Sequence, residues 1–114
     1  MTNDLKKKKC VPCEGGVKPL HGEAIQTYMR ELGGNRNLIG DKMIGKDFPC
    51  INFMHGMNLV NKVAALAEEE GHHPDVCISY TNVRIELFTH AIGGLSENDF
   101  ILATKIDDIL EKRS

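Results

Sequence analysis

The hydrophobic pattern of this 114-residue chain changes its period several times, and each change predicts a new element. Helical spacing begins near Glu23 and stops at Gly33, a typical helix-ending residue. Residues 37–52 then carry short apolar groups broken by glycine and by Pro49, a pattern compatible with two short strands. Because proline cannot donate a hydrogen bond to a sheet ladder, Pro49 indicates a strand edge or a bulge.

A longer helix is predicted from residue 53 onwards. Its apolar side chains recur in steps of four and three, which places five of them on one inner face: Phe53, Met57, Val60, Ala64 and Ala67. Asn52 is suited to cap its N-terminus and Gly71 to end it in a left-handed conformation. The last turn holds the acids Glu68 to Glu70, which oppose the helix dipole, and such local conflicts are found at functional sites.

Alternation of apolar and polar residues after Pro74 predicts an antiparallel hairpin with its turn at Thr81 and Asn82. The second strand has one buried face, formed by Val83, Ile85 and Leu87. Ser96 and Asp99 then have the spacing of a capping box at the start of a last helix. The inner face of that helix is expected to contain Phe100, Ala103, Ile106 or Asp107, and Leu110.

The predicted order is helix, two strands, helix, two strands, helix, which gives an α+β fold because helices back the two hairpins. Residues 1–19 are rich in lysine, glycine and proline, and we expect them to form a flexible N-terminal leader. Residues 20–114 are expected to form a single domain. A domain of this size buries only a modest core, so self-association is a reasonable expectation.

Composition narrows the class of protein. The chain is 41% hydrophobic and 26% charged, as in ordinary globular domains, and its formal net charge of −2 argues against general binding to nucleic acid or acidic membranes. No apolar stretch has the length of a membrane span, and none follows the early lysines as a signal peptide would require. The expected location is therefore the cytoplasm.

The cysteine pattern is compatible with three interpretations. Cys10 and Cys13 have the Cys-x-x-Cys spacing of zinc sites and of redox motifs. A structural zinc site needs two more ligands, and Cys50 and Cys77 stand alone rather than as a second close pair. We therefore expect reduced thiols and a plain N-terminal loop around Cys10 and Cys13.

Three histidines are the main candidates for chemistry. His72 and His73 directly follow the long helix, and Pro74 restricts the backbone after them. His90 ends the last predicted strand. Because antiparallel neighbours place the start of one strand beside the end of the other, the hairpin is expected to bring His90 to the His72–His73 corner.

The pattern alone leaves three interpretations of this cluster open. Imidazole exchanges protons near neutral pH, which suits acid–base catalysis. Three histidines also suit a catalytic zinc ion, for which Glu68 is the obvious orienting carboxylate. The third interpretation is that the histidines are structural or merely exposed.

These residues carry a resemblance to a known family. The run Glu68-x3-His72-His73-Pro74-x5-Tyr80-x9-His90-x8-Asp99 resembles the signature of pterin-4a-carbinolamine dehydratases. The resemblance extends over residues 48–109 and more loosely over the first helix. It implies a four-stranded antiparallel sheet with helices packed on one face, a homodimer or homotetramer, a pterin substrate, and no metal or organic cofactor.

The implied reaction is dehydration of a 4a-hydroxytetrahydropterin to the quinonoid dihydropterin, which recycles the pterin cofactor of aromatic amino acid hydroxylases. The resemblance implies that His72 and His90 exchange the protons and that His73 binds the pterin. Glu68, about one turn before His72, is expected to accept a hydrogen bond from it. The remaining matching positions are candidates for the substrate pocket, each with a structural alternative: Pro74, Tyr80 and Asp99.

A second class of function is also compatible with the resemblance, because relatives of this fold act as dimerisation cofactors or assembly factors. A protein with only a binding role has no chemical need for all three histidines together with Glu68. Their joint presence therefore favours the enzyme.

Overall fold

The computed structural model describes residues 5, 8, 10, 18–33 and 36–111. The elements are, in order, α1 (Glu23–Leu32), β1 (Asn37–Ile39), β2 (Met43–Pro49), α2 (Phe53–Glu70), β3 (Asp75–Ser79), β4 (Asn82–Leu87), a 3-10 turn (His90–Ile92) and α3 (Glu97–Glu111). This order confirms the predicted α+β fold.

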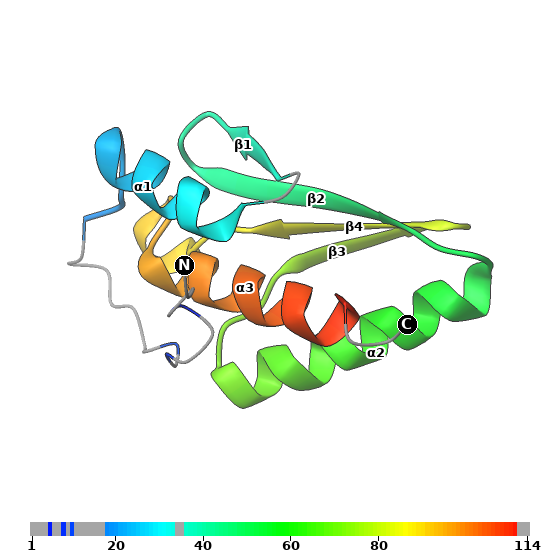
Figure 1. Cartoon of the computed structure of the whole chain (residues 1–114). Coiled ribbons are helices and arrows are strands. Elements are labelled where there is room, and N and C mark those ends of the chain that lie inside the picture. Colours follow the sequence, from blue (N-terminus) through cyan, green and yellow to red (C-terminus); the bar gives the residue numbers. More distant parts are fainter. Residues whose placement is uncertain (1–4, 6–7, 9, 11–17, 34–35, 112–114) are drawn as a thin grey trace.

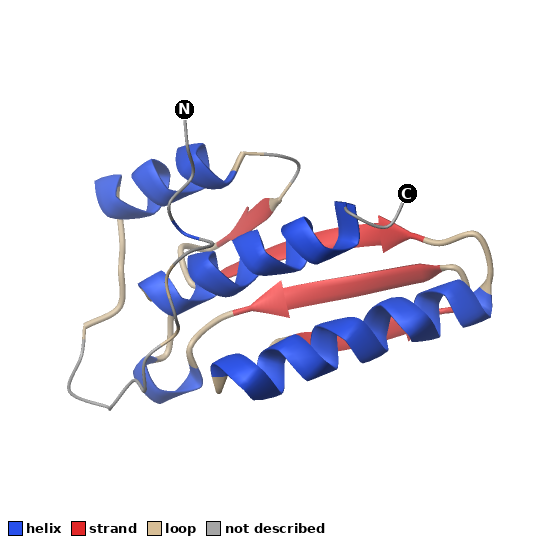
Figure 2. Cartoon of the chain, turned by 60° about the horizontal axis from the view of Figure 1, so that its bottom comes forward, coloured by secondary structure: helices blue, strands red, loops and turns tan. Residues whose placement is uncertain are grey.

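The four strands form one antiparallel sheet in the order β1-β2-β4-β3. Helices α2 and α3 lie side by side across one face of this sheet, and α1 packs against α3 (Figures 1 and 2). The opposite face carries polar side chains, among them Arg84, which pairs with Asp47 at 3.1 Å and with Glu86 at 3.0 Å. The helices thus cover a single face, as predicted.

The core lies between the sheet and the two long helices. The strand β4 contributes the predicted buried face, Val83, Ile85 and Leu87, and α3 is buried around most of its first half. The largest side chains in the core are Phe100, Leu5, Ile25, Ile44, Ile85, Leu87, Leu95, Ile101, Leu102 and Ile106. On α3, Ile106 rather than Asp107 faces the core.

The predicted inner face of α2 was wrong by about one position. Of the five apolar residues expected inside, only Ala67 is buried, and the stripe that meets the sheet is Gly56, Leu59, Val63, Ala67 and Glu70. Two members of this stripe, Gly56 and Glu70, have no apolar side chain, so counting apolar residues does not detect it. A Cβ at Gly56 would make ordinary van der Waals contact with Val83 Cγ2, at 3.4 Å.

Of two local predictions around the strands, the position of the turn needs correction and the strand edge at Pro49 is confirmed. The hairpin turns at Tyr80 and Thr81 rather than at Thr81 and Asn82, and Tyr80 has a φ of 47°. For Pro49 the edge is confirmed and the bulge is not, because β1 pairs only with residues 43–45 of β2 and the β2–β4 register runs without interruption to the Pro49–Asn82 pair. Pro49 is the last residue of β2, so its missing N–H leaves no gap within the ladder of hydrogen bonds.

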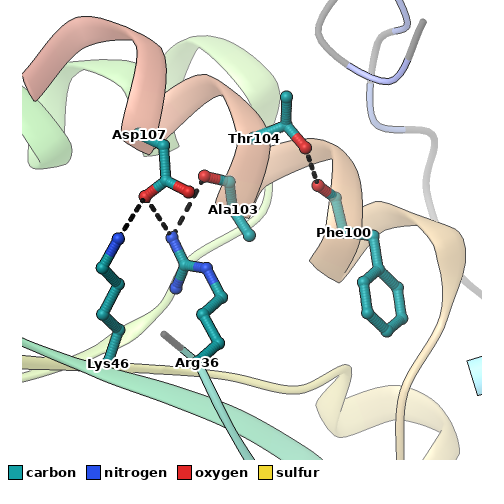
Figure 3. Close-up of polar contacts among 6 residues, drawn as sticks. All are labelled: Arg36, Lys46, Phe100, Ala103, Thr104 and Asp107. Atoms are coloured by element: carbon teal, nitrogen blue, oxygen red, sulfur yellow. Dashed lines mark hydrogen bonds and ion pairs between the residues drawn. The ribbon is translucent and has the colours of Figure 1, made fainter. Parts of the chain in front are cut away.

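A buried arginine joins the chain before β1 to α3. The side chain of Arg36 is 1% exposed, and its Nη2 donates to Asp107 Oδ1 at 2.6 Å and to the carbonyl of Ala103 at 3.2 Å. Lys46 approaches the same Asp107 oxygen at 3.4 Å (Figure 3). Burial lowers the pKa of Arg36, and the Asp107 carboxylate opposes that effect.

Part of the expected leader packs on the domain. Leu5 is 1% exposed within the core cluster, and Lys8 and Cys10 contact residues of α3. Cys13 lies outside the described residues, so the hypotheses about the Cys10–Cys13 pair stay predictions, as does the domain boundary at residue 19. Within the described parts of the chain, no helix has the length and apolar character needed to cross a bilayer.

Candidate active site

The end of α2 fixes the position of His72. Gly71 takes a left-handed conformation, with φ of 67° and ψ of 27°, which a glycine adopts without strain. The N–H groups of Gly71 and His72 both donate to the carbonyl of Ala67, that of His72 at 3.2 Å. This termination turns the chain sharply and directs His72 toward α3 instead of continuing the helix.

The hairpin brings the third histidine to the same place. Asp75, at the start of β3, lies opposite Glu86 near the end of β4. The strand ends at Leu87, so His90 begins a 3-10 turn instead of ending the strand as predicted. A depression of about 300 Å³ opens there, lined by Gly71, His72, His73, Pro74, Asp75, Thr89, His90 and Ala91. All three histidines thus line one depression.

The partner of His72 is Asp99. The Nε2 atom of His72 lies 2.6 Å from Asp99 Oδ1, and the side chains are 11% and 0% exposed. The other carboxylate oxygen accepts hydrogen bonds from the backbone N–H of Ser96 at 2.9 Å and from Thr89 Oγ1 at 2.8 Å. Asp99 therefore caps α3, as its spacing predicts, and at the same time orients His72.

Glu68 does not contact His72 as expected. Its carboxylate lies 2.5 Å from His73 Nε2, and both side chains are largely exposed. Glu68 lies on the outer face of α2, whereas the turn after Gly71 sends His72 inward and His73 outward. The two histidines therefore have separate carboxylate partners, Asp99 inside and Glu68 outside.

The remaining candidates divide by location. His90 is exposed, and its ring packs on Phe88 with 4.0 Å between the ring centroids. Pro74 forms part of the depression. Tyr80 lies at the opposite end of the hairpin and is 75% exposed, so the structure does not bring it to the histidines.

Thr89 is a site residue that the pattern did not single out for chemistry. It follows the buried residues Val83, Ile85 and Leu87 in the same alternation, so its side chain is buried as theirs are. A hydroxyl at a buried position needs a hydrogen-bond partner. Its Oγ1 donates to Asp99 and lies 2.7 Å from the Ser96 hydroxyl, which then acts as the donor to Thr89. The signal available in the sequence was therefore a polar residue at an apolar position, next to His90.

Comparison with known proteins decides the family. The family model described as pterin 4 alpha carbinolamine dehydratase matches residues 18–109. The chain belongs to this pterin dehydratase family.

Relatives span nearly the whole chain. A protein of Nitrosospira multiformis is 48% identical over 109 residues, covering 96% of this chain and 95% of its own. One of Alkaliphilus metalliredigens is 43% identical over 105 residues, covering 92% and 95%. Both are named as candidate pterin-4-alpha-carbinolamine dehydratases.

Solved structures agree with the pterin dehydratase fold. The transcriptional coactivator/pterin dehydratase of Brucella melitensis matches with a TM-score of 0.73 and 27% identity, over 81% of this chain and 98% of that chain. A pterin dehydratase-like protein, described as a RuBisCO assembly factor in the alpha-carboxysome, matches with a TM-score of 0.54 and 25% identity, over 66% and 86%.

The histidine cluster of this family member has no arrangement suited to a metal ion. Among the described residues, no group of three or more His, Cys, Asp or Glu side chains is placed to hold one. The expectation that no metal or organic cofactor takes part stays a prediction.

Proposed function

We propose that this protein dehydrates a 4a-hydroxytetrahydropterin to the quinonoid dihydropterin by histidine acid–base catalysis. The observation that carries the proposal is the depression lined by His72, His73 and His90, in which a buried carboxylate orients one imidazole. Family membership supplies the substrate class.

The reaction needs two proton transfers and no change of oxidation state. The bond between C4a and the hydroxyl oxygen breaks, a proton joins that oxygen to release water, and the proton on ring nitrogen N5 is removed as the C4a–N5 double bond forms. An imidazole can perform either transfer at neutral pH. His72 and His90 are assigned to these two steps.

Contacts of each histidine support a division of labour. His72 contacts Asp99 through Nε2, which assigns Nδ1 to proton exchange with the pterin. His73 contacts Glu68 and is assigned to pterin binding, with Glu68 orienting it. Pro74 is assigned to the wall of the depression and Asp99 to holding His72, while Tyr80 receives no role because it lies at the other end of the hairpin.

The alternative function is that of a binding protein without catalysis. The structural neighbour described as a RuBisCO assembly factor supports this alternative, so the experiment must distinguish the two functions. Both functions are compatible with a homodimer or homotetramer, which remains our expectation for this chain. Only catalysis requires His72 and His90 to act in proton transfer.

The decisive experiment follows dehydration of a synthetic 4a-hydroxytetrahydropterin by the purified protein in the presence of a chelator. Replacing His72 or His90 with alanine should lower kcat by roughly 10²-fold or more, as expected when a general acid or base is lost. Replacing His73 should mainly raise KM. His21→Ala is the control, because His21 is exposed and lies outside the depression.

Two results would contradict the proposal. A wild-type protein that binds a pterin without accelerating its dehydration would favour the binding role. Activity that the chelator abolishes and added zinc restores would instead show a metal mechanism.

A further inference from the structure

The described residues Lys8 and Cys10 of the N-terminal leader contact the start of α3, the helix that carries Asp99. Lys8 Nζ lies 2.6 Å from Glu97 Oε2, and the thiol of Cys10 donates to the carbonyl of Asn98 at 3.6 Å. Pro19 lies so close to Gly94 that a Cβ there would approach Pro19 Cβ to 2.8 Å. These contacts surround the segment that precedes Asp99.

Glu70 connects the leader to the end of α2. Its side chain is 2% exposed, and the other two acids of this helix end, Glu68 and Glu69, are exposed. One Glu70 oxygen accepts the backbone N–H of Cys10 at 2.9 Å, and the other lies 2.6 Å from Lys105 Nζ. A carboxylate at a helix C-terminus faces the negative end of the dipole, so burial there requires such compensating donors.

The Glu70–Lys105 pair lies beside the residues that form the site. Glu70 precedes His72 by two positions, at the helix end that sets the direction of its side chain. Lys105 lies on α3, six residues or about 9 Å after Asp99 on the same helix. The ion pair therefore fixes the end of α2 against the helix that carries Asp99.

We propose that Glu70 is a positioning residue: by holding Lys105 and the backbone of Cys10, it keeps His72 in hydrogen-bonding register with Asp99. The backbone of Cys10 is thus part of the support of the site. This inference deepens the proposed dehydratase function and rests on it for its catalytic consequence.

A purely structural role predicts a different result from a positioning role. Loss of a buried ion pair anywhere in the domain should lower the free energy of unfolding, with no specific effect on the histidines. The Arg36–Asp107 pair provides a matched control, because it is also buried, has the same 2.6 Å separation, and joins α3 to the chain before β1 rather than to the end of α2. Asp107→Asn breaks that pair without touching the depression.

The test compares Glu70→Gln with Asp107→Asn in the full chain, at a temperature where both variants are folded by circular dichroism. For Glu70→Gln we expect kcat to fall by about tenfold with KM little changed, since small displacements of a catalytic group lower the rate strongly. The ¹⁵N chemical shift of His72 Nε2 should also move. For Asp107→Asn we expect a lower melting temperature with the wild-type kcat and His72 shift.

Further outcomes keep this inference separate from the proposed function. Wild-type kcat together with an unchanged His72 shift in Glu70→Gln would overturn it. If the wild-type protein proves inactive, the proposed function fails, and the His72 shift alone decides whether Glu70 positions that ring. If Glu70→Gln does not fold, Lys105→Gln weakens the same pair from α3 and should give the same pattern of effects.

Discussion

Cys10 should react with thiol reagents much more slowly than an exposed cysteine, because its docked position favours the neutral thiol. Burial raises the pKa of Cys10 from the ordinary 9.0 to about 12, and the Glu70 carboxylate adds to this rise while Lys105 opposes it. The reactive species is the thiolate. The rate of alkylation therefore measures both the docking of the leader and its electrostatic surroundings.

The magnitude follows from the two pKa values. At pH 8, a thiol with a pKa of 9.0 is about one-tenth ionised, and a thiol with a pKa of about 12 is ionised to roughly one part in 10⁴. Alkylation of docked Cys10 should therefore be roughly 10³-fold slower than that of an exposed thiol. Because the docked state favours the neutral form, its contribution to stability is complete below pH 9.0 and is lost as the pH rises toward about 12.

The assay is a time course with iodoacetamide, with each cysteine followed by peptide mass spectrometry. Cys77 is exposed and serves as the internal comparison. Glu70→Gln should accelerate labelling of Cys10, because the amide carries no charge, and leave Cys77 unchanged. Equal labelling rates for Cys10 and Cys77 at pH 8 would refute the docked leader.

Three further predictions concern stability. Phe100→Ala should lower the free energy of unfolding by roughly 3–5 kcal/mol in urea titrations, since Phe100 is 0% exposed, whereas Ile51→Ala, at a position 84% exposed, should change it by at most about 0.5 kcal/mol. Asn52→Ala removes the N-cap of α2 and should lower the same quantity by about 1 kcal/mol; an unchanged urea midpoint would show that the cap is dispensable. The hydrogen bond from Lys8 lowers the pKa of Glu97, so the stabilisation from this pair is present above pH 4.5 and is lost as the pH falls below it. Glu97→Gln should accordingly flatten the acid side of the melting temperature plotted against pH.

Within the described parts of the chain, the hydrophobic period together with its glycine and proline breaks predicted the three α-helices and four strands, but not the 3-10 turn at His90–Ile92. Caps were equally legible: Asn52, Gly71 and Ser96 act where their positions indicated. The inner face of α2 was not predicted correctly, since its buried stripe includes Gly56 and Glu70, neither of which counts as an apolar side chain.

The part of the site that depends on the β3–β4 pairing was predictable from the sequence. Antiparallel pairing places His90 beside His72 and His73 whatever the packing of the helices. The predicted carboxylate partner of His72 was wrong, because helical spacing suggested Glu68, whereas the sharp turn after Gly71 redirects the His72 side chain to Asp99 and leaves Glu68 to His73. The contacts of Glu70 with Lys105 and Cys10 depend on how α3 packs against α2 and Cys10, and no local sequence pattern specifies that packing.

The docking of the leader also has a consequence for the order of folding. Lys8 and Cys10 meet partners 89 and 88 residues further along the chain. Closing a loop of that length costs about 4 kcal/mol of chain entropy, so these contacts form only after α3 has packed on the sheet. On the ribosome Lys8 and Cys10 are synthesised well before α3. These two residues must therefore wait for α3 before they can make their contacts.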